Sequence, residues 1–206
     1  MEVKDRVLRR VVNQFHRPHG LGGSLAGLVM AHRSSNRERN RWVVSLLSVQ
    51  PSDRVLEVGF GPGIATRELS RLASRGQIFG IDHSQVMLQQ ASKRNSVGIR
   101  AGRVDLRLGS VEQLPDFGGP LDKILAVNSV GFWPEPVARL SELRSMLRPG
   151  GEIAIASQPR CPGATRETSA RAVTEIAGLL REAGFSDPRV ETLDLEPPVV
   201  CVLASK

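Results

Sequence analysis

The stretch Arg54-Val55-Leu56-Glu57-Val58-Gly59-Phe60-Gly61-Pro62-Gly63 decides the fold of this chain. Its first half is typical of a buried strand, and three glycines then follow at every second position. Residues 64–72 carry apolar side chains at helical spacing. A strand, a glycine loop and a helix in this order bring backbone N–H groups and a helix N-terminus close to a ligand, because glycine leaves room for the approach. The alternative interpretation is a tight turn that binds nothing.

The glycine spacing indicates which ligand the loop suits. A dinucleotide loop needs G-x-G-x-x-G, but its third glycine would fall on Ile64 or Thr66. A phosphate-binding P-loop needs a lysine after the last glycine, and none lies nearby. The pattern instead places Glu57 on the strand, two residues before the first glycine. A carboxylate there repels pyrophosphate and favours a cationic ligand that carries an amino acid group.

A second acidic residue lies where a nucleoside would need it. Residues 77–82 read as the next strand and end in Asp82. An acid at the tip of the second strand of a doubly wound sheet accepts hydrogen bonds from both ribose hydroxyls. The same position also suits an acid that caps the following helix.

Strand and helix patterns alternate from Arg54 onward, which predicts an α/β fold with a doubly wound parallel sheet. Further strands are expected over residues 104–108, 121–128, 152–156, 189–194 and 199–203. Helices are expected over residues 84–95, 137–147 and 166–183, with a turn at 148–151 before the fifth strand.

The motif Glu57-x-Gly59-x-Gly61-x-Gly63 resembles the first motif of the class I S-adenosylmethionine (SAM) methyltransferases. Asp82, the run Leu147-Arg148-Pro149-Gly150-Gly151 before an apolar strand and the terminal hairpin extend the resemblance over residues 53–206. It is closest to the small-molecule methyltransferases of the ubiquinone and menaquinone type. The resemblance implies a Rossmann-like, mostly parallel sheet of seven strands whose last strand is antiparallel.

The resemblance also implies a set of SAM contacts. The glycine loop meets the methionine portion, Glu57 supports the loop and its ammonium ligand, and Asp82 binds the ribose. Met87 is either a core residue or an adenine contact. The family's Gly-Asp-Ala adenine motif is replaced here by Gly109-Ser110-Val111, so that Ser110 or Glu112 takes over. The residues expected to contact SAM are Glu57, Gly59, Gly61, Gly63, Asp82, His83, Met87, Ser110, Val111, Glu112 and Asn128.

The acceptor site is expected at the end of the fourth strand. Asn128 is a candidate catalytic residue there, and Ser129, Phe132 and Trp133 are candidate substrate contacts, although the two aromatic residues also suit ordinary packing. His16 and His19 are candidate general bases, because histidine titrates near neutral pH; the alternative is that both are surface residues. No metal-binding spacing is present in the sequence.

The basic charge of the chain is concentrated at its N-terminus. The net charge is +7, and residues 1–41 hold nine basic against three acidic residues. Residues 1–50 are expected to form helices, the third over residues 36–49 with Arg37, Arg39 and Arg41 facing outward. The sequence therefore predicts a helical cover, or lid, over residues 1–50 and a SAM-binding domain over residues 51–206; plain capping of the core is the alternative.

The predicted function is SAM-dependent methyl transfer to a small, apolar or aromatic acceptor. The alternatives are a ribosomal or transfer RNA methyltransferase that grips RNA through the basic N-terminus, and a SAM-binding protein without catalysis. No stable nucleic-acid partner and no membrane span are expected, and the oligomeric state is expected to be a monomer or a homodimer. Cys161 and Cys201 form no framework, and the N-terminus lacks a secretory pattern, so a cytoplasmic location is expected. The preference for arginine over lysine indicates a GC-rich, bacterial genome.

Overall fold

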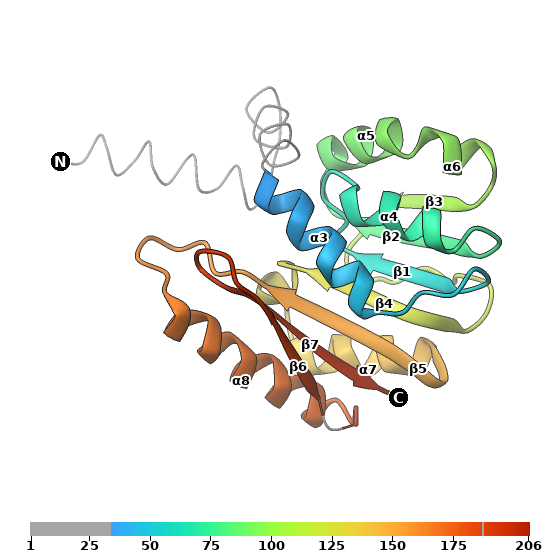
Figure 1. Cartoon of the computed structure of the whole chain (residues 1–206). Helices are drawn as coiled ribbons and strands as arrows, with labels where there is room; N and C mark the ends of the chain where they lie inside the picture. The colour runs from blue at the N-terminus through green and yellow to red at the C-terminus, as the bar shows by residue number, and fades with distance from the viewer. Residues whose placement is uncertain (1–33, 187) are drawn as a thin grey trace.

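The computed structural model describes residues 34–186 and 188–206 (Figure 1). Its strands form one sheet of seven in the order β3-β2-β1-β4-β5-β7-β6. The strands are β1 (Arg54–Val58), β2 (Gln77–Asp82), β3 (Val104–Leu108), β4 (Leu121–Val127), β5 (Leu147–Ser157), β6 (Arg189–Leu193) and β7 (Val199–Ser205). All neighbouring strands from β3 to β5 are parallel, and β7 is antiparallel to both β5 and β6. The predicted doubly wound, mostly parallel sheet with an antiparallel last strand is confirmed.

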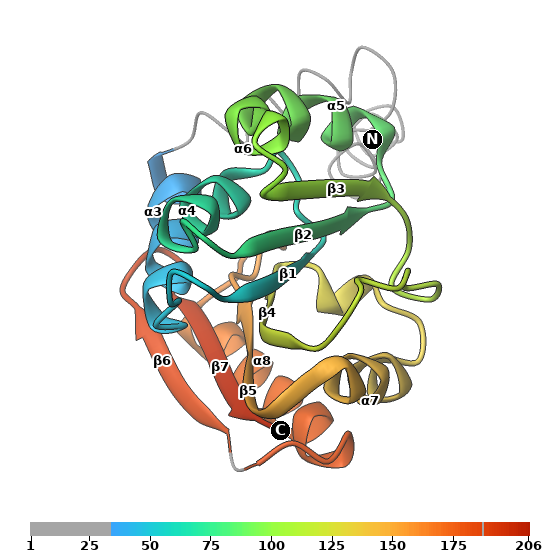
Figure 2. The same cartoon turned by 90° about the vertical axis from the view of Figure 1, so that its right-hand side faces the viewer.

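Helices cover both faces of this sheet (Figure 2). The helices are α3 (Ser34–Leu46), α4 (Ile64–Leu72), α5 (Gln85–Arg94), α6 (Ser96–Arg100), α7 (Pro136–Met146) and α8 (Arg166–Glu182), and a 3-10 turn, η1, spans Val130–Phe132. The predicted helix over 84–95 is followed by α6, which the sequence analysis missed. The longest described helix has 17 residues, and no helix in the described part of the chain is long and apolar enough to cross a membrane.

The core has two layers because successive side chains of a strand point to opposite faces of the sheet. Val55 packs with α3 and α4 on one face, whereas Leu56, its neighbour on β1, packs with α7 and α8 on the other. Both side chains are fully buried. Glu57 follows Val55 on the same face, so β1 directs this carboxylate toward α4.

Helix α3 packs into the core as the first described element. Val43, Val44 and Leu47 are at most 2% exposed and share a cluster with β1 and α4. The predicted outward orientation of Arg39 is wrong: its side chain is only 5% exposed, whereas Arg37 and Arg41 are exposed. An α-helix repeats every 3.6 residues rather than every two. Three arginines at every second position therefore cannot all lie on one face of the helix. The predicted lid lies mainly in residues 1–33, outside the described residues, and stays a prediction.

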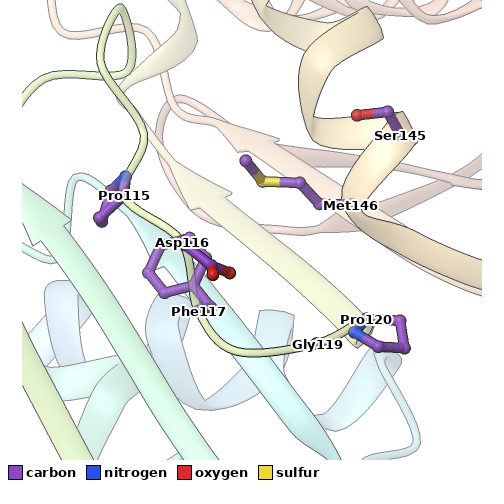
Figure 3. Close-up of a pocket in the computed structure, with 7 residues that line it drawn as sticks. All are labelled: Pro115, Asp116, Phe117, Gly119, Pro120, Ser145 and Met146. Atoms are coloured by element: carbon purple, nitrogen blue, oxygen red, sulfur yellow. The ribbon is translucent and has the colours of Figure 1, made fainter.

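The connection from β3 to β4 has no helix. Residues 109–120 cross the sheet as a loop, and Phe117 anchors the loop in the core at 7% exposure. A cavity of about 260 Å³ lies between this loop and the end of α7, with the Met146 side chain directed toward the loop (Figure 3). Because Gly119 and Pro120 line it just before β4 begins, this cavity lies at the amino end of the strand, away from the glycine loop.

Strand β5 begins earlier than predicted. Leu147 already pairs with Leu121 of β4, and the pairing then shifts register before Lys123 meets Glu152. Gly150 adopts φ +72° in this irregular segment, a conformation that glycine reaches without strain. The predicted turn at 148–151 is therefore an irregular stretch inside the strand. The predicted closing hairpin is confirmed as β6 and β7.

Candidate functional site

The glycine loop is folded by its own backbone bonds at the carboxyl end of β1. Gly59 N donates to Ile81 O of β2 at 2.8 Å, and Gly63 N donates back to Phe60 O at 2.9 Å. Gly59, Gly61 and Gly63 all have positive φ, of 80°, 50° and 74°. Gly63 is the residue that precedes the first turn of α4. The loop therefore presents its backbone and the N-terminus of α4 at the edge of the sheet where a doubly wound fold binds its ligand.

The three glycines are required for different reasons. A Cβ on Gly59 would lie 2.7 Å from Ser129 Cβ, and one on Gly63 would lie 2.6 Å from Asn95 Nδ2. A Cβ on Gly61 would meet nothing within 4 Å. The expectation that all three glycines make room for a ligand therefore needs correction. Gly59 and Gly63 allow protein groups to pack, and only Gly61 borders open space.

Asp82 joins the tip of β2 to the glycine loop. Its Oδ2 accepts from Gly61 N at 2.8 Å and its Oδ1 from Ser84 N at 2.9 Å, just before α5 begins. The residue is 7% exposed, and burial raises the pKa of its carboxyl, while the two backbone hydrogen bonds oppose that rise. A carboxylate oxygen has two lone pairs, so each oxygen keeps one for a ligand hydroxyl. The residue that caps α5 is Ser84, whose hydroxyl accepts from Met87 N at 3.4 Å, so the alternative of an acid that caps the helix is wrong. Ribose binding at the remaining lone pairs of Asp82 stays a prediction.

Glu57 lies beneath the loop at 1% exposure. Its Oε2 accepts from the Thr66 hydroxyl at 2.5 Å, and the Thr66 backbone N–H also donates to the carboxylate. Burial raises the pKa of Glu57 to about 8, against the hydrogen bonds from Thr66. The carboxylate therefore fixes the first turn of α4, as the predicted supporting role requires, and its contact with an ammonium group stays a prediction.

The tip of β4 is tied to the strands on either side of it. The Ser129 hydroxyl donates to Val58 O of β1 at 2.8 Å. Asn128 adopts φ 54°, and its Oδ1 accepts from Gln158 N at the end of β5 at 2.7 Å. Because β1 and β4 are neighbours whose connections run in opposite directions, this is the topological switch point of the sheet. Asn128 and Ser129 therefore lie at the predicted place, and their catalytic and substrate roles stay predictions.

The residues expected around adenine divide into core and surface. Met87 is 3% exposed and packs with Phe60 and Ala91 of its own small cluster, which favours the core alternative. Val111 is 6% exposed and belongs to the larger core cluster. On the surface side, His83 and Glu112 are exposed, and the Ser110 hydroxyl lies 3.1 Å from a Glu112 carboxylate oxygen.

The two aromatic candidates of the acceptor site are separated by the 3-10 turn. Phe132 is 60% exposed, whereas Trp133 packs against the core. The two aromatic side chains therefore do not form one exposed surface, and Phe132 is the more exposed of the two. His16 and His19, the candidate bases, lie outside the described residues.

Sequence reasoning missed four polar residues that hold the site. Thr66 partners Glu57, and Asn95 donates to Gly63 O at 3.1 Å from the end of α5. Gln158 and Arg39 hydrogen-bond to each other at 2.7 Å. Thr66 and Arg39 fall on helices and Asn95 lies between two helices, places where polar residues are usually exposed, so no local pattern marked them. Gln158 directly follows an apolar strand, which was the one available signal.

The site fits a nucleoside ligand that also carries positive charge. Gly61 leaves an open approach to backbone, Asp82 offers free lone pairs beside it, and Glu57 adds a second acidic group underneath. A positive charge on the ligand would favour the ionised form of both carboxyl groups, whose pKa burial raises in the protein alone. These observations match the residues expected for SAM.

Comparisons with known proteins agree with this geometry. The sequence model of a family described as "Methyltransferase domain" matches residues 55–151. The chain is 31% identical to the uncharacterized methyltransferase YdaC of Bacillus subtilis, over 88% of this chain and 98% of that protein. It is also 31% identical to a ubiquinone biosynthesis O-methyltransferase of Xanthomonas campestris, over 55% of this chain but only 46% of that protein. A SAM-dependent methyltransferase of Aquifex aeolicus superposes with a TM-score of 0.65 at 22% identity, over 81% of this chain and 88% of that one. The chain therefore belongs to the class I SAM-dependent methyltransferases, and SAM is its cofactor.

Proposed function

We propose that this methyltransferase transfers the methyl group to a small-molecule acceptor bound at the carboxyl ends of β4 and β5. The observation that carries the proposal is the switch point itself. Ser129 of the β4 tip touches β1 where the glycine loop begins, and Asn128 bonds to the end of β5. A ligand on the glycine loop and a second ligand at the end of β5 would therefore be separated only by Asn128 and Ser129.

Named residues of this chain hold the cofactor in this proposal. Gly61 allows the backbone to approach, Asp82 accepts hydrogen bonds from the ribose hydroxyls, and Glu57 lies beneath the cationic amino acid portion. When bound, the cofactor supplies a methyl group on a sulfonium, which leaves as a neutral thioether. The protein's task is then to align the acceptor with the methyl group and to keep water away.

The described part of the acceptor edge has little acid–base chemistry of its own. Asn128 Oδ1 already accepts from Gln158 N, and an amide does not take up a proton near neutral pH. His83 is the one histidine among the described residues, and it follows the ribose-binding position rather than the β4 tip. We therefore propose that Asn128 positions the β4–β5 edge, and that His16 or His19 acts as the base where the acceptor needs one.

A small, apolar or aromatic acceptor is supported by two observations. Exposed Phe132 provides an aromatic surface beside the β4 tip. The ubiquinone biosynthesis relative is named for a small-molecule pathway, and the chain spans about half the length of that relative. The nucleic-acid alternative depends on the basic residues 1–41, of which residues 1–33 lie outside the described part. Monomeric or dimeric assembly and a cytoplasmic location remain predictions.

Two measurements test the proposal. Calorimetry with SAM, S-adenosylhomocysteine, NAD and ATP is expected to detect binding of the first two only. A panel of phenols, quinols, amines and carboxylates, followed through S-adenosylhomocysteine formation, is expected to reveal turnover. SAM binding without turnover on any acceptor would favour a non-catalytic role, and salt-sensitive binding and methylation of RNA would favour the nucleic-acid alternative.

A further inference from the structure

In the part of the chain that the structure describes, a positively charged side chain is buried near the end of β5 without an acidic partner. Arg39 of α3 is 5% exposed, and it is the one arginine among the described residues that is buried to this degree. No ion pair of Arg39 with a carboxylate is found in the described part of the chain, and the charged group that acts on it there is Arg160, which is also positive. Burial and Arg160 lower the pKa of Arg39 to about 9, so the guanidinium stays charged at neutral pH.

Within residues 34–186 and 188–206, the groups that hold the guanidinium are neutral. Its Nη1 donates to Gln158 Oε1 at 2.7 Å, and its Nη2 donates to Asn36 Oδ1. The Nε–H is buried and has no acceptor among the described residues. Removing a charge from water without a counter-ion is costly, and a buried guanidinium is normally matched by a carboxylate or phosphate. Among the described residues, this buried cation therefore has no negatively charged partner.

A cavity adjoins the same residues. It has a volume of about 340 Å³ and lies between the loop after β5 and the loop from β6 to β7, which run side by side in Figure 1. Its wall includes Gln158, the partner of Arg39, and Ser35, which lies one helical turn before Arg39. Residues four apart on a helix share a face, so Arg39 lies on the face of α3 that borders the cavity. The remaining lining residues are Pro159, Arg160, Cys161, Gly163, Ala164, Glu196 and Pro197.

The charges around the cavity favour an anion beside Gln158. Glu196 is the one acidic side chain in the lining, and it is exposed, so water and salt screen it. Arg39 does not line the cavity itself but bonds to Gln158 of its wall, where it is shielded from water and keeps its effect on a nearby ligand. Arg160 adds a second positive charge to the wall.

The cavity also lies on the correct side of the switch point for an acceptor. Gln158 N donates to Asn128 Oδ1, so the cavity wall and the β4 tip are directly bonded. The residues that fit the cofactor lie on the other side, on β1 and β2. We propose that this cavity binds the methyl acceptor through a carboxylate that pairs with the guanidinium of Arg39, next to Gln158. This inference rests on the proposed function for the identity of the occupant, but carboxylate binding is measurable without turnover.

The test uses the full-length protein saturated with S-adenosylhomocysteine. Its probes are benzoate, phenylacetate and hexanoate, each compared with its own carboxamide by calorimetry or ligand-observed NMR. We expect at least one carboxylate to bind about tenfold more tightly than its amide, as a single charge-assisted bidentate contact predicts. If no carboxylate is preferred over its amide, the proposal is wrong.

Variants identify the group responsible. Arg39→Gln is expected to remove the preference for the carboxylate and to leave SAM affinity within about twofold of the wild type. The matched control is Arg41→Gln on the same helix, because Arg41 is 64% exposed and pairs with Glu68; it should retain the preference. If Arg39→Gln instead weakens SAM and leaves the probes unaffected, the guanidinium holds the cofactor's own carboxylate and the acceptor assignment is overturned.

A second variant covers the case in which Arg39→Gln fails to fold. Gln158→Glu places a carboxylate where the Gln158 amide oxygen now accepts from Arg39, so it gives the guanidinium a counter-ion in place. This variant should fold at least as stably as the wild type and should no longer prefer carboxylates over amides. An unchanged preference for carboxylates in Gln158→Glu would contradict the proposal. A wild-type protein that does not bind SAM would contradict the proposed function instead.

Discussion

The Thr66 hydroxyl donates a 2.5 Å hydrogen bond to the buried carboxyl of Glu57. Among the described residues, Thr66 is the only one whose side chain donates to this carboxyl, and it belongs to the helix that follows the glycine loop. Burial nevertheless dominates and raises the pKa of Glu57 to about 8, from an ordinary value of 4.5. The folded protein therefore retains a proton on Glu57 over a pH range in which the unfolded chain has already released it.

This difference predicts that the cofactor-free protein loses stability as the pH rises. Between an ordinary carboxyl pKa and about 8, the folded state binds more protons at Glu57 than the unfolded state. Glu57 then lowers the free energy of unfolding by up to about 1.4 kcal/mol per pH unit. Glu57→Gln should reduce this dependence in urea denaturation between about pH 5 and pH 8, while the raised pKa of Asp82 leaves a smaller dependence of the same sign. Glu182→Gln, at the exposed end of α8, should keep it; an equally flat profile in the wild type would show that Glu57 ionises normally.

Substitutions in the glycine loop should separate folding from binding. Gly61→Ala introduces a Cβ into open space, so it should cost only the strain of a positive φ, about 1–2 kcal/mol, while it obstructs the ligand. Gly59→Ala and Gly63→Ala place a Cβ within 2.7 Å of neighbouring protein atoms and should destabilise the fold more. Thermal denaturation and SAM calorimetry on the same three proteins check this ordering. It is wrong if Gly61→Ala binds SAM normally.

Asp82→Ala should weaken both SAM binding and the fold. The loss of two hydrogen bonds to ribose is expected to reduce SAM binding by about 2–4 kcal/mol. The tip of a strand is usually peripheral to the core, but here the fold should suffer as well. Gly61 N and Ser84 N both lose their acceptor, at roughly 1–3 kcal/mol. Asp82→Asn keeps one acceptor oxygen and should be the milder variant in denaturation; normal SAM affinity in Asp82→Ala would place the ribose elsewhere.

Deletion of residues 1–33 tests the predicted lid. The truncated chain begins at α3, whose side chains Val43 and Val44 belong to the core, so it should still fold. We expect it to bind SAM but to lose turnover of the acceptor, since the lid is predicted to close the site and to carry His16 and His19. Turnover is followed through S-adenosylhomocysteine formation and SAM binding by calorimetry. A truncated protein that methylates at the original rate would show that the segment is not a lid.

The sequence by itself determined the sheet and the cofactor edge. The positions of Glu57 and Asp82 follow from the two-residue period of their strands, and that of Gly61 from a loop that a side chain would obstruct. The structure places them together because the carboxyl ends of β1 and β2 are adjacent in a parallel sheet. Boundaries were less certain where the pattern was irregular, as at Leu147, where β5 begins before its glycines.

The polar interior was decided only by tertiary structure. Position 59 must lack a Cβ because Ser129, which follows a different strand, packs against it. Arg39 is buried because it bonds to Gln158, 119 positions away. A helix pattern predicts that an arginine lies at the surface, since burying a charge is costly. Whether a particular arginine escapes that rule depends on which distant backbone and amide groups surround it. Those groups meet only once β4, β5 and α3 have packed together, so the charge beside the acceptor edge is a property of the fold rather than of any local stretch of sequence.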